Sequence, residues 1–127
     1  MSWISCTGDA CTGDVIMFSE TVWEGSFRKP KSKGTRTIKA RIVKDSYGVD
    51  KQQHTFTLDV EECTGVDLLE TGSTIKRKGR NIYRNGTVRL KWADENERRK
   101  VLEDKHQRGD EARLARTARK AFQVELD

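Results

Sequence analysis

The sequence predicts a mainly β fold, a small antiparallel barrel or strongly twisted sheet of OB- or PUA-like size, followed by a charged C-terminal helical segment. Two observations predict it. Apolar and polar residues alternate in several stretches before Trp92, and after it the chain becomes strongly charged and helix-forming. We expect residues 1–93 to form the barrel-like domain and residues 94–127 a helical extension. A chain of 127 residues suits one modest core.

The first predicted strand, Val15 to Trp23, has a less regular apolar pattern and is expected to cross the core. After it, Glu24 to Gly34 contains the only proline, two glycines and four cations, which is typical of a mobile basic loop. Such a loop can clamp a phosphate backbone or simply be solvated, and the sequence leaves both interpretations open.

Two half-buried strands are expected next. In TIKARIVKD, residues 37–45, Ile38 and every second residue after it are apolar up to Ile42. In HTFTLDVEE, residues 54–62, the same spacing runs from His54 to Val60. The segment between them, DSYGVDKQQ, suits a turn because of its Asp, Ser and Gly. We therefore expect an antiparallel hairpin with an exposed loop.

Asn85-Gly86 predicts a second hairpin, because a type I′ turn needs positive φ at both central residues. Its strands are expected at Asn81 to Arg84 and at Thr87 to Trp92. In the latter, three apolar residues are expected to face the core and two cations to face water: Val88, Leu90 and Trp92 against Arg89 and Lys91. Strict alternation fails in the former, where cations share the parity of Ile82, so a twist, a bulge or a lined groove is expected there.

The charged segment after Trp92 is predicted to be helical. Asp94 is expected to be the N-cap, with Glu97 at the capping-box position. Gly109 predicts a break, and a second helix is expected from Asp110, with a thin apolar stripe that frays or folds against a partner.

Positive charge is concentrated in one segment, residues 73–93. This segment has seven cations and no Asp or Glu, whereas the whole chain has a formal net charge of +5. A local field of this sign attracts polyanions. We therefore expect a nucleic-acid-binding module, DNA favoured over RNA, whose basic β-hairpin contacts the phosphate backbone. The alternative is a protein-interaction module that docks an acidic partner through the hairpin and the C-terminal helix.

The expected nucleic-acid contacts are Lys76, Arg77, Lys78, Arg80, Asn81, Tyr83, Arg84, Arg89 and Lys91, with possible secondary contacts from Arg28, Lys29, Lys31, Lys33 and Tyr47. Among them, Tyr83 or Tyr47 is a candidate to stack on an unpaired base, and Asn81 either reads a base edge or caps the turn. The three tryptophans are expected to pack in the core or on the surface rather than against bases.

Catalytic and metal sites are not favoured. Cys6, Cys11, Cys63 and His54 supply the ligand types of a Cys3His zinc site, but their spacing is a poor match, and ordinary thiols in turn-forming segments are favoured. The sequence contains no P-loop, dinucleotide fingerprint or metalloprotease helix. We expect no enzyme, no cofactor and no metal.

The chain's setting is expected to be intracellular. No apolar run approaches the length of a membrane span, the first residues lack the features of a signal peptide, and the mean hydropathy is −0.82. Three cysteines cannot all pair within one chain, which favours a reducing compartment. We expect no membrane partner.

Four segments of the sequence carry a family resemblance: CTGD with VIMF, RIVKDSYGVDKQQHTFTLDVE, KRKGRNIYRNG, and Trp92 with DENERRKVLEDKHQRG. In this order they resemble a domain of plant nuclear proteins that also carry SAP modules or CCCH-type zinc fingers. The likeness runs from about Cys6 to Gly109. It implies company with DNA- and RNA-binding modules and a nuclear location. This chain itself shows neither SAP helices nor a CCCH finger, so the implied role would rest on this domain alone.

Overall fold

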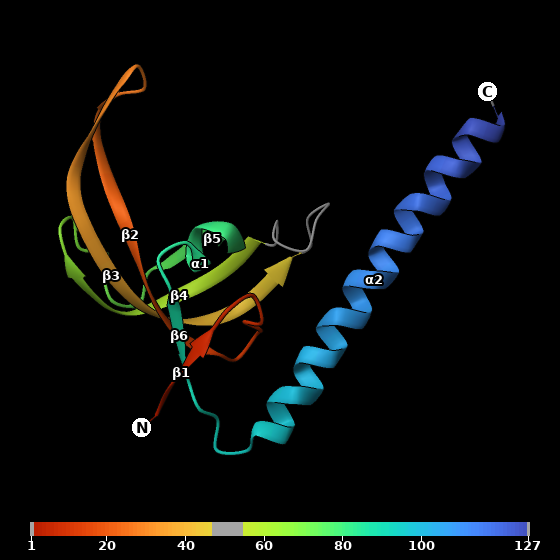
Figure 1. The fold of residues 1–127 in the computed structure, drawn as a ribbon, viewed down its shortest axis with the longest axis horizontal. Helices are drawn as coiled ribbons and strands as arrows, with labels where there is room; N and C mark the ends of the chain where they lie inside the picture. The colour runs from red at the N-terminus through yellow and green to blue at the C-terminus, as the bar shows by residue number, and fades with distance from the viewer. Residues whose placement is uncertain (1, 47–54, 127) are drawn as a thin grey trace.

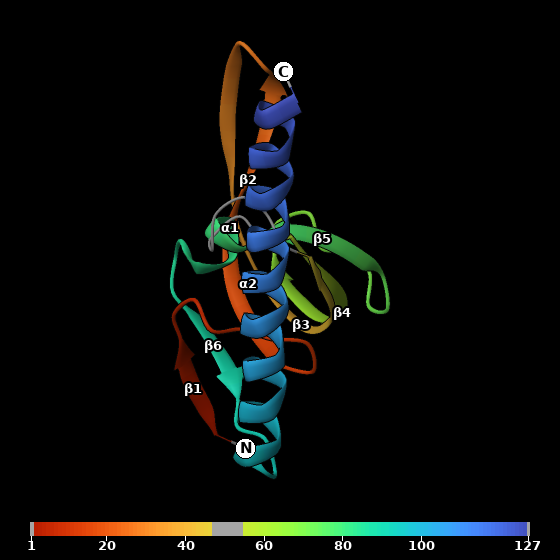
Figure 2. The ribbon, with the colours of Figure 1, turned by 90° about the vertical axis from the view of Figure 1, so that its right-hand side faces the viewer.

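In a computed structural model, which describes residues 2–46 and 55–126, the chain forms one antiparallel sheet and one long helix (Figures 1 and 2). The elements are β1 (Trp3–Cys6), β2 (Val15–Ser26), β3 (Lys29–Ser46), β4 (Thr55–Gly65), β5 (Thr74–Lys78), α1 (Gly79–Tyr83), β6 (Thr87–Leu90) and α2 (Glu95–Leu126). Within these residues the strand order is β1-β6-β2-β3-β4-β5. Because β1 and β5 are both edges, the sheet is not a closed barrel. The mainly β prediction is confirmed as a strongly twisted sheet.

The sheet curls so far that β5 faces β2. Adjacent strands lie about 4.8 Å apart, so these two, separated by three intervals, would lie about 14 Å apart in a flat sheet. Arg77 of β5 nevertheless donates a hydrogen bond of 2.9 Å from Nε to Glu20 Oε2 of β2. The curl visible in Figure 1 thus creates a concave face with β2 and β5 on opposite sides.

One end of the concave face is the hydrophobic core. Alternate residues in one part of β2, of β3 and of β4 are buried there: Ile16, Phe18, Ile38, Ala40, Ile42, Phe56, Leu58 and Val60, joined by Ile82 of α1. The predicted strands over residues 37–45 and 54–62 are confirmed where the structure describes them, and β3 and β4 pair antiparallel, with Ile42 opposite Leu58. The connecting residues 47–54, including Tyr47 and His54, lie outside the described residues.

The prediction of a basic loop over Glu24 to Gly34 is wrong. β2 and β3 continue through it as a two-stranded arm, whose last pair is Ser26 with Lys29. Pro30 is tolerated there because β3 has a strand neighbour on one side only, an edge position in which a proline breaks no ladder. Gly25 is required, since its φ is 91° and a Cβ would lie 2.8 Å from the Lys29 carbonyl oxygen.

The predicted hairpin at Asn85-Gly86 is also wrong. Residues 79–83 form the short helix α1, and β6 pairs instead with β1 and β2. A helical turn buries Gly79 and Ile82 together, three residues apart, whereas a strand would have placed the flanking cations in the core. Gly86 has φ 80°, but Asn85 does not adopt positive φ, so no type I′ turn forms. This resolves the failed alternation of the sequence.

The C-terminal segment is one helix rather than two. Asp94 is the N-cap as predicted, because its Oδ1 accepts a hydrogen bond from the Asn96 amide at 2.9 Å. Gly109 is buried inside α2 and does not break it, since an interior glycine costs a helix only about 1 kcal/mol. None of the described helices is both long and apolar enough to cross a bilayer.

Buried polar contacts attach α2 to the loop between β1 and β2. Asp14 is fully buried and accepts hydrogen bonds from Arg98 Nε at 2.9 Å and Trp92 Nε1 at 2.7 Å. About two turns further along α2, Lys105 donates a hydrogen bond from Nζ to the Ala10 carbonyl oxygen at 2.5 Å. The first half of α2 is therefore fixed, whereas its C-terminal half diverges from the sheet (Figure 1).

Candidate nucleic-acid interface

Four of the five exposed cations in residues 73–93 lie on β5 or in and just after α1, and the fifth, Lys91, follows β6. β5 alternates, so Lys76 and Lys78 point outward while Ile75 and Arg77 point to the concave face. In and just after α1, Arg80 and Arg84 are exposed. No salt bridge within the described residues engages any of these four outward cations, which leaves their charges available to an anionic ligand.

Two predicted contacts, Arg77 and Arg89, are held by the protein's own carboxylates. Arg77 forms a bidentate pair with Glu20, at 2.9 and 3.0 Å. Arg89 is only 7% exposed and pairs with Glu95 at 2.8 Å, so the prediction that it faces water is wrong. β6 lies between β1 and β2, and the start of α2 supplies the carboxylate that makes burial of this arginine tolerable. Lys91, by contrast, is exposed as predicted.

Tyr83 does not stack on a base in this arrangement. Its hydroxyl oxygen accepts a hydrogen bond from the Ala10 amide at 3.0 Å, and its ring packs against the core. Burial raises the pKa of Tyr83 well above its ordinary value. The sequence-based expectation is wrong for this residue because the helical turn of α1 directs it inward, and Tyr47 lies outside the described residues.

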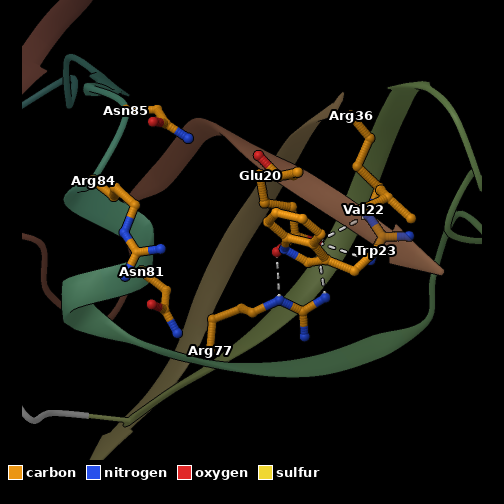
Figure 3. Close-up of a pocket in the computed structure, with 9 residues that line it drawn as sticks. Glu20, Val22, Trp23, Arg36, Arg77, Asn81, Arg84 and Asn85 are labelled. Atoms are coloured by element: carbon orange, nitrogen blue, oxygen red, sulfur yellow. Dashed lines mark hydrogen bonds and ion pairs between the residues drawn. The ribbon is translucent and has the colours of Figure 1, made fainter. Parts of the chain in front are cut away.

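The other end of the concave face is a polar pocket of about 520 Å³ (Figure 3). Its lining comes from β2, β3, β5 and the α1 region: Glu20, Thr21, Val22, Trp23, Arg36, Arg77, Asn81, Arg84 and Asn85. Figure 3 shows Asn81 and Arg84 projecting from α1 on one side, with Glu20 and Trp23 on the other. Three arginines against one glutamate give this lining a formal charge of +2.

Glu20 organises the floor of this pocket. It binds Arg77 from β5 and, at 2.8 Å, Arg36 from the opposite register position of β3. Burial alone would raise the pKa of Glu20, but hydrogen bonds from Arg77 and Arg36 outweigh it and hold the pKa below its ordinary value. One carboxylate thus orients two guanidinium groups and leaves a net positive charge.

Sequence reasoning missed Trp23, Glu20 and Arg36 as site residues. Trp23 is 62% exposed at the pocket mouth rather than packed. A signal for the other two was available, since Glu20 has the parity of the buried Phe18 and Arg36 that of the buried Ile38. Charged residues at core parity in neighbouring strands indicate either an internal ion pair or a lined site.

The arm formed by β2 and β3 carries the predicted secondary contacts. Arg28, Lys29 and Lys31 are exposed near its tip, whereas Lys33 pairs with Asp67 at 2.7 Å. Phe27 is fully exposed at the tip. A second hollow, of about 380 Å³, lies between this phenylalanine, Pro30 and Trp23, so it shares the tryptophan with the first pocket.

The buried thiols show no sign of reactivity. Cys6 and Cys11 donate to Asp9 and Asp14, and burial, reinforced by these carboxylates, raises the pKa of both thiols to about 12. A thiol with so high a pKa is a poor nucleophile at neutral pH. Among the described residues, no group of three or more His, Cys, Asp and Glu side chains is arranged to hold a metal ion.

Comparison with known proteins shows which family and which plant protein this chain resembles. Residues 11–92, well over half of the chain, match the family described as "Domain of unknown function (DUF7699)". The chain is 39% identical over 121 residues to the "Zinc finger CCCH domain-containing protein 62" of Oryza sativa subsp. japonica, an alignment that covers 91% of this chain and 17% of the rice protein. No solved structure matches. The chain belongs to the DUF7699 domain family.

Proposed function

We propose that this domain binds nucleic acid through the cationic surface of β5 and α1, with DNA favoured over RNA. One observation carries the proposal, the outward display of four cations that no described carboxylate neutralises: Lys76, Lys78, Arg80 and Arg84. Phosphate contacts supply most of the affinity of non-specific nucleic-acid binding, and they require accessible Lys and Arg side chains. The basic β-hairpin of the sequence-based prediction is replaced in this role by a strand and a helical turn.

The setting we propose is nuclear. The rice relative is named for a CCCH zinc finger. The sequence resemblance to a domain of plant proteins with SAP modules or CCCH-type zinc fingers also implies company with DNA- and RNA-binding modules. Because the chain corresponds to 17% of that protein's length, any role for the whole protein is part of the proposal. We propose no enzymatic activity and no cofactor.

A salt titration tests the proposal. Four neutralised phosphates predict that log affinity falls against log salt concentration with a slope of about −3.6 on duplex DNA, or about −2.8 on a single strand. Fluorescence anisotropy with labelled DNA and RNA, both single-stranded and duplex, measures this slope. Absence of binding at low salt, or a slope near zero, would overturn the proposal.

Matched variants locate the surface. A variant with alanine at all four outward cations should lose most of the affinity and most of the slope. The control removes three exposed cations of α2 instead, at Arg99, Lys100 and Arg108. It is compared with a variant that removes three of the four outward cations, Lys78, Arg80 and Arg84, so that both variants lose the same charge. An equal loss in both variants would show that net charge alone, rather than this surface, governs binding.

The second candidate is a protein-interaction module for an acidic partner. The divergence of α2 from the sheet and the exposed Leu114, 69% accessible, favour it, because a helix with an uncovered apolar residue can fold further against a partner. Deleting residues 110–127 separates the two functions. It should abolish binding of such a partner and spare nucleic-acid affinity.

A further inference from the structure

We propose that the pocket between β2, β5 and α1 takes one unpaired nucleotide, with the Trp23 indole as the stacking platform. This inference rests on the proposed function, because it names the ligand of a hollow that adjoins the cationic surface. It adds a preference that charge alone would not give. Unpaired nucleic acid should bind in preference to duplex.

The exposed indole is the first observation. Trp23 is 62% exposed although tryptophan is a large apolar residue that is usually well buried. It borders the polar pocket and also the second hollow next to Phe27. An indole face open to a polar, positively charged pocket suits a flat, aromatic and anionic ligand. A nucleotide has all three properties.

The polar groups of α1 are the second observation. Asn81 is exposed, lines the pocket, and makes no side-chain hydrogen bond with the described residues. Its amide carries two donors and an acceptor, the pattern that pairs with the edge of an adenine or another base. The neighbouring Asn85 is already committed, because its Nδ2 donates to the Ser19 carbonyl at 3.1 Å. Asn81 is therefore the free amide that can read a base.

Charge at the pocket is the third observation. Arg84 is exposed at the rim without an ion pair among the described residues, so it is placed to bind a phosphate. On the floor, Glu20 is held by two arginines and does not present a free negative charge. The pocket thus favours an anion (Figure 3).

Size and access favour an unpaired base over a paired one. The volume, about 520 Å³, falls within the range of roughly 300–1,000 Å³ typical of small-ligand pockets. A base within a duplex has both faces stacked and its pairing edge occupied, so it enters a pocket only after unstacking. Single strands present faces and edges without that penalty.

The test compares Trp23→Ala with Trp3→Ala in the full chain. Trp3 is also an exposed tryptophan, at 38%, but it lies on β1 and does not line the pocket. The probes are a labelled single strand, the duplex of the same sequence, and the same strand with abasic positions, all at low salt. Trp23→Ala should weaken single-strand binding by about 5- to 150-fold, the range for loss of one stacked base, and leave duplex binding unchanged.

Several controls keep the outcome interpretable. Trp23→Phe, which retains an aromatic face, should recover part of the affinity, and circular dichroism verifies that each variant folds. Wild type should bind the abasic strand more weakly than the intact strand. Trp23→Ala should bind both strands with the same affinity. Such non-additivity identifies stacking, which a merely structural role of the tryptophan would not produce.

The results distinguish the two proposals. If no nucleic acid binds wild type at low salt, the proposed function fails. If nucleic acid binds but Trp23→Ala behaves as Trp3→Ala does, or intact and abasic strands bind wild type equally, this inference is overturned while the proposed function stands. If polyglutamate displaces the single strand from wild type and binds Trp23→Ala more weakly than wild type, the pocket binds an acidic peptide. The inference is then likewise overturned.

Discussion

The buried pair between Asp14 and Arg98 is predicted to be a main stabilising link between α2 and the rest of the domain. Asp14 is fully buried and Arg98 is 6% exposed. Both guanidinium nitrogens that face the carboxylate lie close to it, at 2.9 and 3.0 Å, and the Cys11 amide and the Trp92 indole donate to the same carboxylate. Removing one partner of such a pair leaves an uncompensated buried charge.

Asp14→Ala should therefore lower the free energy of unfolding by about 3–5 kcal/mol, the range measured for broken buried pairs. At about 4 °C per kcal/mol for a domain of this size, Tm should fall by about 12–20 °C. Thermal and urea unfolding followed by circular dichroism measures both quantities. The matched control is Lys100→Met on the exposed side of α2, which should change the free energy by less than about 0.5 kcal/mol.

A double-mutant cycle tests the pairing itself. Arg98→Met keeps the apolar stem and removes the charge, so Asp14→Ala combined with Arg98→Met should be less destabilised than the sum of the single variants by more than about 1 kcal/mol. An additive cycle, or a cost of less than about 1 kcal/mol for Asp14→Ala, would contradict a stabilising pair between Asp14 and Arg98. In either case the carboxylate of Asp9, 3.5 Å from the Arg98 side chain, would be holding the charge instead.

The thiols, a buried tyrosine and the ion pair that begins α2 each support a further prediction. Iodoacetamide should alkylate Cys63 well before Cys6 or Cys11, because burial raises the pKa of the latter two thiols to about 12. Equal alkylation rates in peptide mapping would contradict this. Tyr83→Phe should lower the free energy of unfolding by about 1 kcal/mol, the value of one hydrogen bond, and leave nucleic-acid affinity unchanged in a binding titration. Hydrogen bonds from Arg89 lower the pKa of Glu95 from 4.5 to about 2. The contribution of this ion pair to the free energy of unfolding is therefore present above pH 4.5 and lost as the pH falls toward 2. Glu95→Gln should weaken that acid dependence of Tm.

Strand periodicity predicted the centre of the fold because it is a local property. The alternation around Ile38 and Leu58 is repeated every second residue, so the pattern alone identifies the buried face of β3 and β4. It failed at α1, where a strand interpretation would have buried cations with Ile82. The prediction followed the turn preference of Asn85-Gly86 and explained the irregular parity by a twist, a bulge or a lined groove, whereas the structure has helical spacing there.

The pocket could not be predicted from local patterns, because it depends on the curl of the whole sheet. Glu20 and Arg77 are 57 residues apart in sequence, and three strand intervals separate them within the sheet. The sequence indicated where cations are concentrated but not which of them would be neutralised. Only the arrangement of strands decides that Arg77 turns inward while Lys76 and Lys78, its neighbours on β5, remain outside.

A competing explanation for the outward lysines is protection of an open sheet edge. β5 is an edge strand, and charged residues on edges prevent pairing with other chains. Two observations limit this explanation. The opposite edge, β1, carries no charged residue over Trp3–Cys6, and Arg80 and Arg84 lie on the helical turn, which offers no ladder to protect. Edge protection is moreover indifferent to the sign of the charge. Edge protection therefore does not explain why residues 73–93 contain no Asp or Glu. A surface that binds a polyanion explains it, because carboxylates there would repel the phosphates.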